Sequence, residues 1–276
     1  MSALPRGKVF IEGRYRKLTR DLPQTVFHCP VCKGHPRRRK GCERCEGFGK
    51  LTRDSVQELV AWVLGAAVKT RKNKFHGAGR EDVDVRMLGE GRPFVLEFID
   101  PKVLDVDLAA LEAEVNRRNE GRLEIRGLHW SEKARVRVLK ETEHAKEYGL
   151  LVEAAEDPPE GAFEALAGRR LDLEQKTPQR VAHRRADKVR ERWLEVLAVE
   201  PDESGDGRRW RLRVRTQHGT YVKEAVTGED GATTPSIAGL VGVPCACVEL
   251  DVLEILSVEG APLESRPASV RFGEGL

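Results

Sequence analysis

Two pairs of cysteines near the start of the chain constrain its fold more than any other feature. They are Cys29-Pro-Val-Cys32 and Cys42-Glu-Arg-Cys45, and nine residues separate them. Four thiolates at this spacing can reach one tetrahedral zinc ion at about 2.3 Å each. A glycine follows soon after each pair, where a tight turn lets backbone N–H groups point at sulfur. The pattern predicts a closed, structural zinc site, with redox dithiols or an iron–sulfur cluster as alternatives.

The charge distribution divides the chain into two parts. Residues 1–53 hold 14 Lys and Arg against 4 Asp and Glu, whereas the remainder holds 34 against 41. A basic segment beside an acidic one favours a polyanionic partner such as nucleic acid. A basic run, RRRK at 37–40, lies between the cysteine pairs, where a loop would project it. We therefore expect a small zinc-binding basic module over 1–53, followed by a larger domain over 54–276.

Several classes of protein are disfavoured by what the sequence lacks. No apolar run approaches the roughly 20 residues of a membrane-spanning helix, and nothing at the start resembles a signal peptide. We therefore expect a cytoplasmic protein without a membrane partner. The chain has no Walker loop, no dinucleotide-binding glycine motif, no HExxH and no serine-elbow motif. Nucleotide-dependent and ordinary hydrolytic chemistry are thus disfavoured.

The apolar pattern predicts an α+β fold with a mostly antiparallel sheet and helices between its hairpins. Ser55 and Glu58 form a capping box that should open a helix from about 55 to 70. A helical stripe predicts a second helix over 107–118. Strands are expected at 93–99, 122–128, 134–140, 149–155, 193–200, 210–216 and 247–255. Short helices are expected near 162–167, 218–228 and 234–242. Cys245 and Cys247, in the final apolar segment, should be small buried hydrophobic residues.

One stretch, FHGAGREDVDVRMLG at 75–89, fits neither a helical stripe nor a strand alternation. It concentrates charge beside a glycine turn. Two explanations are open: a solvated loop, or a loop in which one carboxylate performs chemistry. Taken alone, the residues favour the solvated loop. The charged residues are Arg80, Glu81, Asp82, Asp84 and Arg86.

Two other short segments carry residues that suit a planar base. Tyr148 ends the triplet KEY and leads into a strand, and Tyr221 with Lys223 lies in GTYVK between a strand and a helix. Together with an acid, these side chains could flank one base. Taken separately, each tyrosine is more often a half-buried strand residue with a hydrated hydroxyl, and the lysine a surface residue.

Long segments carry a family resemblance. GAGREDVDVRMLGEGRPF, KEY, KTPQRVAHRRADKVR (176–190) and GTYVKEAVTGEDGATTPS (219–236) resemble the archaeal Pus10 family of tRNA pseudouridine synthases. GRYRKLTRDLPQT (13–25), before the cysteine pairs, is similar to that family's zinc region. The resemblance covers nearly the whole chain. It implies a pseudouridine-synthase-like, mostly antiparallel sheet preceded by the zinc module, in a short form that lacks most of the family's N-terminal THUMP-containing portion.

The resemblance also implies an activity and its residues. The chain would be an isomerase that converts uridine to pseudouridine in the T-loop of tRNA, at position 54, 55 or both. Asp82 would be the nucleophile, with Asp84 as its rival. Lys223 would favour the ionised form of Asp82. Tyr148 and Tyr221 would contact the unstacked target nucleotide.

Further expectations follow from the same resemblance. Arg80 would fill the gap left by the target base or hold phosphate. A phosphate track is expected at Arg180, His183, Arg184 and Arg185. The reaction needs no catalytic cofactor, so zinc would be purely structural, and we expect a monomer whose partner is tRNA. The alternative is a catalytically inactive, zinc-containing RNA-binding protein with a synthase-like fold.

Overall fold

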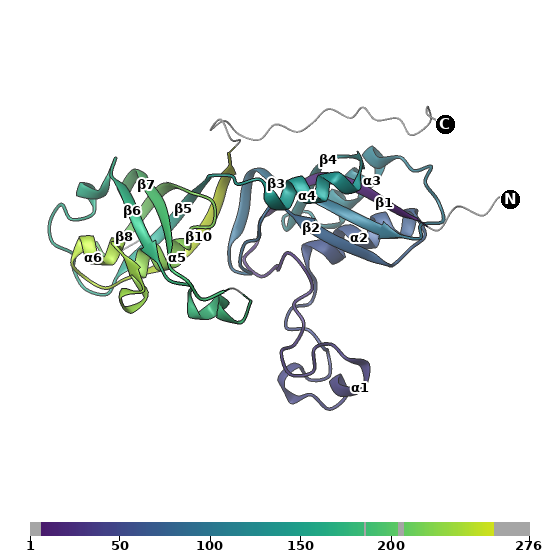
Figure 1. Cartoon of the computed structure of the whole chain (residues 1–276), viewed down its shortest axis with the longest axis horizontal. Coiled ribbons are helices and arrows are strands. Elements are labelled where there is room, and N and C mark those ends of the chain that lie inside the picture. The colour runs from purple at the N-terminus through teal and green to yellow at the C-terminus, as the bar shows by residue number, and fades with distance from the viewer. Residues whose placement is uncertain (1–6, 185, 204–206, 257–276) are drawn as a thin grey trace. The chain divides into compact units, whose positions relative to one another are not determined.

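A computed structural model describes residues 7–184, 186–203 and 207–256 of the chain. The chain divides into two compact units (Figure 1). The described residues up to 142 form unit 1, and those from 143 to 256 form unit 2. Each unit is described by itself below. Residues 257–276 of the expected larger domain lie outside the described residues.

Unit 1 is built on a sheet in which β1 (Lys8–Lys17) lies between β3 (Arg86–Ile99) and β4 (Leu123–Ser131). The strand β2 (Asn73–Gly77) also pairs with β3, and all these pairings are antiparallel. The apolar segment 94–98 of β3 has a neighbour on each side, β1 and β2, and is buried throughout. A strand that has neighbours on both sides and is covered on both faces carries apolar residues at successive positions. This explains why PFVLEF shows no alternation of apolar and polar residues.

Two helices of unit 1 begin at residues whose side chains cap them. The helix α2 (Val56–Ala67) starts at Ser55, whose Oγ accepts a hydrogen bond from the Glu58 N–H at 3.3 Å and donates to the Glu58 carboxylate at 2.8 Å. This confirms Ser55 as the predicted N-cap and its pairing with Glu58. The helix α3 (Leu108–Arg118) starts at Asp107, whose carboxylate accepts from Ala110 N–H at 3.0 Å. The helical stripe over 107–118 is confirmed as well.

One predicted strand is wrong. Residues 134–140 lie in a helix, α4 (Lys133–Glu141). The alternation ARVRVLK suggested a strand, but Val136 and Leu139 are three residues apart and share one helical face. Both pack against the cluster of Phe10, Ala78 and Val95. Tertiary contact with this cluster outweighs the local alternation, and Val138 is left 45% exposed.

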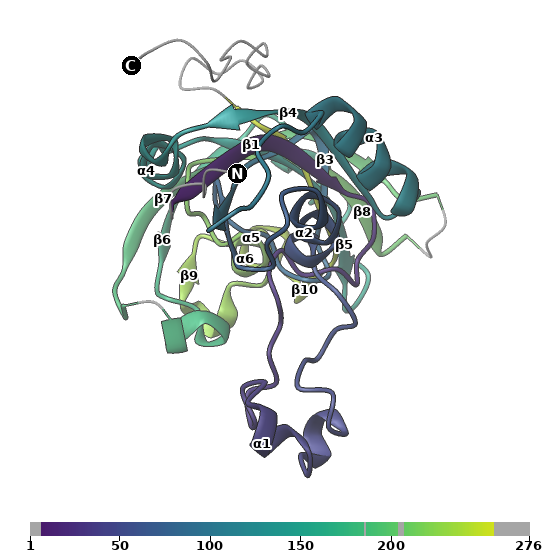
Figure 2. The ribbon, with the colours of Figure 1, turned by 90° about the vertical axis from the view of Figure 1, so that its right-hand side faces the viewer.

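The cysteine pairs lie in an excursion of unit 1 between β1 and α2, which Figure 2 shows in purple and dark blue with its short helix α1 (Pro36–Arg39). A 3-10 turn, η1 (Glu43–Cys45), joins the two cysteines of the second pair. Gly34 and Gly47 turn the chain after the two pairs with φ values of +70° and +80°. A bridge between His28 and Lys50 closes the base of the excursion. The expected domain boundary between residues 53 and 54 stays a prediction. β1 lies within the expected module of residues 1–53, but it is a strand of the unit 1 sheet.

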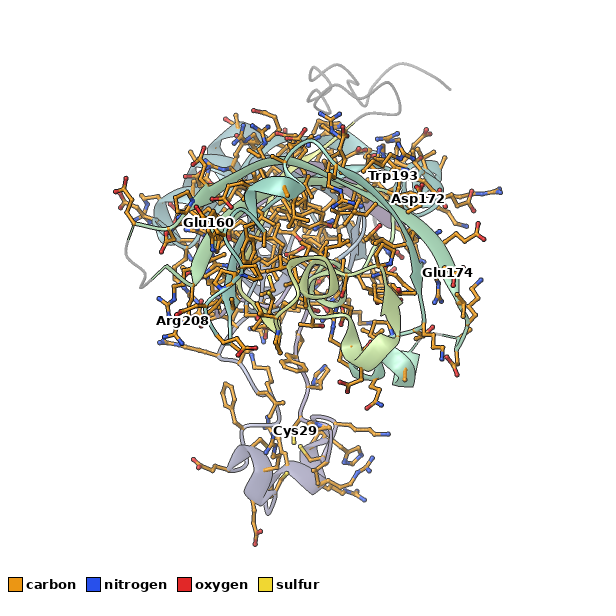
Figure 3. The ribbon with its side chains drawn as sticks, turned by 90° about the vertical axis from the view of Figure 1, so that its left-hand side faces the viewer. Cys29, Glu160, Asp172, Glu174, Trp193 and Arg208 are labelled. Carbon is orange, nitrogen blue, oxygen red and sulfur yellow. The ribbon has the colours of Figure 1, made fainter. Side chains whose placement is uncertain are left out.

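Unit 2 is a second antiparallel arrangement, with strand order β10-β5-β8-β7-β6-β9. Its pairings are all antiparallel. The strands are β5 (Lys146–Ala154), β6 (Arg170–Gln175), β7 (Arg190–Pro201), β8 (Arg209–Thr216), β9 (Thr233–Thr234) and β10 (Cys245–Ile255). The predicted hairpin over 193–200 and 210–216 is confirmed as β7 and β8, whereas β6 and β9 were not predicted. Asp172 on β6 lies opposite Trp193 on β7 (Figure 3).

The helices of unit 2 are short. They are the 3-10 turns η2 (Glu164–Leu166), η3 (Gln179–Arg184) and η4 (Glu229–Gly231) and the α-helices α5 (Val222–Thr227) and α6 (Ile237–Val241). Phe163, just before η2, stacks on Trp210 of β8 with ring centroids 4.9 Å apart. Cys245 is buried as predicted, and Cys247 is partly buried. The α+β fold with a mostly antiparallel sheet is confirmed. No helix within the described ranges is long and apolar enough to cross a membrane.

Candidate functional site

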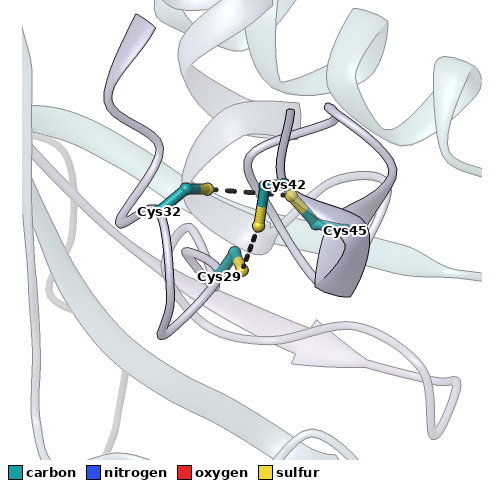
Figure 4. Close-up of side chains that lie close together, drawn as sticks. All are labelled: Cys29, Cys32, Cys42 and Cys45. Carbon is teal, nitrogen blue, oxygen red and sulfur yellow. Dashed lines mark hydrogen bonds between the residues drawn. The ribbon is translucent and has the colours of Figure 1, made fainter. Parts of the chain in front are cut away.

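The four cysteines of the two pairs are buried and meet in one cluster (Figure 4). Their sulfur atoms all lie within 4.8 Å of one another. The Sγ atoms of Cys29 and Cys42 are 3.8 Å apart, and those of Cys32 and Cys45 are 3.7 Å apart. A tetrahedral zinc ion with Zn–S bonds of about 2.3 Å holds its sulfur atoms about 3.8 Å apart. The donor set and its spacing are therefore compatible with zinc.

Backbone N–H groups lie close to two sulfur atoms of the cluster, and the thiolate is the metal-binding form of cysteine. The Gly49 N–H donates to Cys45 Sγ at 3.1 Å. The backbone N–H of Cys32 is the main cause that lowers the pKa of the Cys29 thiol to about 7. Burial has the opposite effect on Cys32 and raises the pKa of its thiol to about 11. A bound cation would supply the charge that lets all four sulfur atoms ionise in this buried place.

The glycine-rich loop after β2 is anchored by a buried ion pair. The carboxylate of Glu81 accepts a hydrogen bond from Arg92 Nε at 2.8 Å, and the two residues are 5% and 1% exposed. The Tyr15 hydroxyl donates to both oxygens of the same carboxylate at 2.8 and 2.9 Å. Burial, together with the charge of Glu81, raises the pKa of Tyr15 well above its ordinary value. The hydroxyl therefore stays protonated and remains a donor.

Side chains also hold the backbone of this loop. Arg92 Nη1 donates to the carbonyl of Ala78 at 2.6 Å. Gln24 Nε2 donates to the carbonyl of Gly79 at 3.0 Å. Gly79 has a φ of +80°, and a Cβ there would lie 3.0 Å from Arg92 Nη1. The turn therefore needs glycine, both for its backbone conformation and for the close approach of the arginine.

Lys17, at the end of β1, binds the backbone beside Asp82. The lysine is fully buried, and its Nζ donates to the carbonyls of Leu22 at 2.8 Å, Asp82 at 2.9 Å and Val83 at 2.9 Å. An ammonium group has three N–H donors, and all three are engaged. Burial lowers the pKa of Lys17 to about 8, and the charge of Glu81 acts against this shift. Lys17 thus fixes two successive peptide groups at the position of Asp82.

The predicted site residues of unit 1 lie on this anchored loop. Asp82 is partly buried, and its carbonyl also accepts from the Val85 N–H at 3.2 Å in a turn. Asp84 is exposed, and its carbonyl accepts from Arg20 Nη1 at 3.2 Å. Arg80 is exposed. The loop is therefore not simply solvated, because its backbone is held from several sides while Asp82 stays accessible.

In unit 2, Tyr148 lies on β5 between Val214 of β8 and Val252 of β10. Its neighbour Glu147 faces the opposite side of the sheet, because successive side chains of a strand alternate. Arg213 and Arg215 of β8 both bind the Glu147 carboxylate, with shortest distances of 2.5 and 2.8 Å. Burial raises the pKa of Glu147, but the two arginines outweigh it and keep that pKa below its ordinary value. In the KEY triplet, the glutamate therefore joins β5 to β8 on the face of the sheet opposite Tyr148.

Two predicted motifs of unit 2 meet at Tyr221, the residue before α5. Gln175 is fully buried, and its amide pairs with the Tyr221 backbone: Nε2 donates to the carbonyl at 3.0 Å, and Oε1 accepts from the N–H at 3.0 Å. Arg180 binds the Glu224 carboxylate at 2.5 and 3.1 Å and lies 6.0 Å from the Tyr221 ring centroid. KTPQR and GTYVK are thus held together. Lys223 is partly buried.

The expected phosphate track is described in part. Arg180 forms the contact with Glu224, which is a contact within the protein. Arg185 lies outside the described residues, and so do the side chains of His183 and Arg184. The track therefore stays a prediction.

The five predicted catalytic and substrate-binding residues fall in different units. Asp82 and Arg80 belong to unit 1, and Tyr148, Tyr221 and Lys223 belong to unit 2. Each group is positioned by partners within its own unit.

Sequence reasoning missed the residues that support the loop, which are Tyr15, Lys17, Gln24 and Arg92. Tyr15, Lys17 and Gln24 fall in the segment GRYRKLTRDLPQT, which was used only for the resemblance. A tyrosine and a lysine two positions apart at the end of a strand pattern could have indicated a shared face. No local signal could have identified their partners on the loop, Glu81 and Asp82, which are 66 and 65 positions away.

Comparisons with known proteins match most of the chain. The family model described as "Pus10, C-terminal" matches residues 10–256. The chain is 43% identical over 256 residues to a protein of Methanothrix thermoacetophila described as "tRNA pseudouridine synthase Pus10", covering 92% of this chain and 55% of that protein. It is 44% identical over 253 residues to a protein of Methanothermobacter marburgensis with the same description, covering 90% and 60%. The chain thus spans somewhat more than half the length of these curated relatives.

A chain of a solved "Cbf5-Nop10-Gar1 Complex" is also similar, with a TM-score of 0.41 and 21% identity, over 72% of this chain and 45% of that chain.

Proposed function

This chain belongs to the Pus10 C-terminal family, and from that membership we propose that it isomerises uridine to pseudouridine in tRNA. The observation that carries the proposal is the identity of 43% and 44%, over nine-tenths of this chain, to proteins described as tRNA pseudouridine synthases. The family-model match spans residues 10–256 and therefore includes the segments that hold Asp82, Tyr148 and Tyr221. The proposed target is the T-loop, at position 54, 55 or both.

Asp82 is the proposed nucleophile. In the proposed reaction its carboxylate adds to C6 of the uracil or to C1′ of the ribose, and the glycosidic bond breaks. The base then rotates and C5 bonds to C1′. The bond between the carboxylate and the substrate breaks, which restores Asp82, the hydrogen on C5 leaves as a proton, and N1 takes up a proton. No net redox change occurs and no outside group is transferred. The anchored loop supports this role, because a nucleophile must be held within a fraction of an ångström of its productive position.

Four other residues are proposed to contact the substrate. Tyr148 and Tyr221 would stack on the unstacked target nucleotide, and aromatic contacts of this kind recover about 1–3 kcal/mol per base. Lys223 would supply positive charge near the nucleophile. Arg80, exposed on the Asp82 loop, would bind phosphate or occupy the space vacated by the base.

Zinc is the proposed metal of the cysteine cluster, bound by Cys29, Cys32, Cys42 and Cys45. Four thiolates fill a tetrahedral shell, so the metal would support the fold of the excursion. None of the proposed chemical steps uses it.

The test is tritium release from tRNA that carries 5-³H-uridine, because exchange at C5 accompanies every turnover. Wild-type chain should release tritium, and Asp82→Asn should not, although it keeps nearly the same shape and binds tRNA with similar affinity. Asp84→Asn is the matched control, since it removes a carboxylate two residues away, and it should keep most activity.

The outcomes separate the alternatives. An inactive Asp84→Asn variant beside an active Asp82→Asn variant would move the nucleophile to Asp84. A wild-type chain that binds tRNA but releases no tritium would favour the inactive RNA-binding protein instead.

A further inference from the structure

A groove in unit 1 runs along one side of α2. Its lining residues do not belong to the loop after β2 that holds Asp82. Its volume is about 720 Å³. The helix contributes Gln57, Glu58, Ala61, Trp62, Gly65 and Ala66, and the opposite side is formed by Val26, Lys69, Thr70, Arg71 and Asn73. The opposite face of α2, with Leu59, Val63 and Leu64 among others, is buried in unit 1. The groove therefore lies on the solvent side of the helix.

Trp62 is the prominent side chain of this groove and is 57% exposed. Its helical neighbours along the groove are Gly65 and Ala66 on the C-terminal side, which are small, and Glu58 on the N-terminal side. Leaving most of an indole in water forgoes a large apolar contact area. The exposed face of the indole is available for a ligand to stack on.

The charges around Trp62 favour an anionic ligand. Lys69 and Arg71 line the groove, and Lys72 follows them; all three are exposed. Within the described parts of the chain, no acidic side chain forms an ion pair with any of the three. Glu58 is the acid among the lining residues, and Lys50 neutralises it at 2.6 Å.

Lys50 also contacts Phe48, an aromatic residue three positions after Cys45 of the cysteine cluster. The Lys50 ammonium lies 5.2 Å from the centroid of the Phe48 ring, and Phe48 is 51% exposed. A second exposed aromatic residue thus stands next to the pair that borders the groove. Aromatic faces alternating with cations are typical of surfaces that bind unpaired nucleotides, because bases stack on the rings and phosphates contact the cations.

We propose that the groove beside Trp62 is a second RNA-contact site, which holds an unpaired nucleotide of the substrate with its base on the Trp62 indole and its phosphates on Lys69 and Arg71. The site is separate in sequence from the proposed catalytic residues and takes no part in the chemistry. The choice of tRNA as the RNA rests on the proposed function.

The test measures equilibrium binding of the full chain to a fluorescently labelled, unmodified tRNA transcript at several salt concentrations. Trp62→Ala should weaken the affinity about 5- to 100-fold, and Trp62→Phe should lose much less because a ring remains. The double change Lys69→Gln and Arg71→Gln should make the log–log salt dependence shallower by about 0.7 per lost phosphate contact.

Trp193→Ala is the matched control. Trp193 is also a partly exposed indole, but the Arg170 guanidinium already lies over its ring at 4.8 Å. Its loss should leave the affinity for tRNA unchanged. A second readout is tryptophan fluorescence: tRNA should quench the wild-type chain more than Trp62→Phe, because the indole in the groove is the one that stacks.

Three outcomes would overturn the proposal. They are unchanged tRNA affinity in Trp62→Ala with an unchanged melting temperature, an equal loss in Trp193→Ala, and a wild-type oligomer that Trp62→Ala dissociates, which would make the groove a protein interface. Failure of the catalytic proposal looks different. Tritium release would then be absent in the wild-type chain while tRNA binding still depended on Trp62.

Discussion

The ammonium of Lys17 donates a hydrogen bond to the backbone carbonyl of Asp82 at 2.9 Å, and a second one to Val83 at the same distance. The lysine is fully buried at the end of β1, a central strand of the unit 1 sheet. The backbone of the proposed nucleophile is thereby joined to a strand that is paired on both sides. The predictions below concern this support, the ion pair beside it and the metal.

Replacing Lys17 by methionine should slow catalysis without weakening tRNA binding. Methionine keeps a similar length but donates no hydrogen bond, so the carbonyls of Asp82 and Val83 lose the hydrogen bonds that join them to β1. A displacement of the loop by about 1 Å would reduce the single-turnover rate of pseudouridine formation roughly 100-fold. Single-turnover kinetics and equilibrium binding, measured on the same protein, separate the two effects.

Arg14→Met is the control for that variant. Arg14 is also a buried cation of β1, and it donates to the carbonyls of Glu90 and Gly91, each at 2.7 Å. Both variants should lower the melting temperature, because each leaves carbonyls without a donor. Only Lys17→Met should slow the chemical step. Equal slowing in both variants would reduce the role of Lys17 to general stability.

The protonation of Lys17 should make stability depend on pH above neutrality. Its pKa is about 8 in the folded chain and about 10.4 in an unfolded one. Between these values the unfolded chain binds more protons, so this group's contribution to the free energy of unfolding rises with pH. The rise should be on the order of 2 kcal/mol between pH 8 and 10. The charged groups that act on Lys17 are Glu81, Asp84, Arg92 and Asp82.

The measurement is urea unfolding of wild-type chain and Lys17→Met from pH 6 to 10. The difference between the two curves isolates the lysine, because the other titrating groups are shared. The rate of the wild-type chain should fall above pH 8, since a neutral amine has two N–H donors for three carbonyls. A difference that stays flat across this range would show that Lys17 keeps its proton.

Removing the carboxylate of Glu81 should lower the free energy of unfolding of unit 1. Glu81→Ala leaves the buried guanidinium of Arg92 without its charge partner, and such a change typically costs about 3–5 kcal/mol. Glu114→Ala is the comparison, because Glu114 binds Arg117 and Arg118 at the exposed end of α3. Its loss should change the unfolding midpoint little. Similar midpoints for the two variants would contradict the assignment of Glu81 as the anchor of the loop.

The cysteine cluster should bind one zinc ion per chain. Metal analysis of the purified protein tests this directly, and an iron–sulfur absorption spectrum would contradict it. Cys45→Ala should lose the metal and make residues 18–55 sensitive to protease, while the rest of unit 1 persists, because β1, β3 and β4 pair without the excursion. Simultaneous digestion of the whole unit would show that the metal supports more than the excursion.

Features with local causes were predicted well. The Ser55–Glu58 capping box depends on residues three positions apart, and the cysteine spacing depends on 17 consecutive residues. The hairpin of β7 and β8 follows from alternation on both sides of a polar loop. In each case the interacting groups are close in the sequence, so their pattern carries the information.

Where two local patterns competed, the sequence alone chose wrongly. Residues 134–140 alternate like a strand, yet Val136 and Leu139 pack on Phe10, Ala78 and Val95 from one face of a helix. The decisive contacts come from three distant segments. Local alternation could not weigh them.

The sequence by itself predicted the cysteine cluster and two helices of unit 1. Its resemblance to a known family supplied the family and the candidate nucleophile Asp82, which stays a proposal. Only the tertiary structure decided that Lys17 is a buried support and Glu81 a structural anchor. A lysine or glutamate looks the same in a sequence whether it is solvated or buried, and charged side chains are usually solvated. Burial of these two depends on β1 lying between β3 and β4, and their partners include residues as far as 66 positions away. The pairing of strands creates that environment, so no local pattern could reveal it.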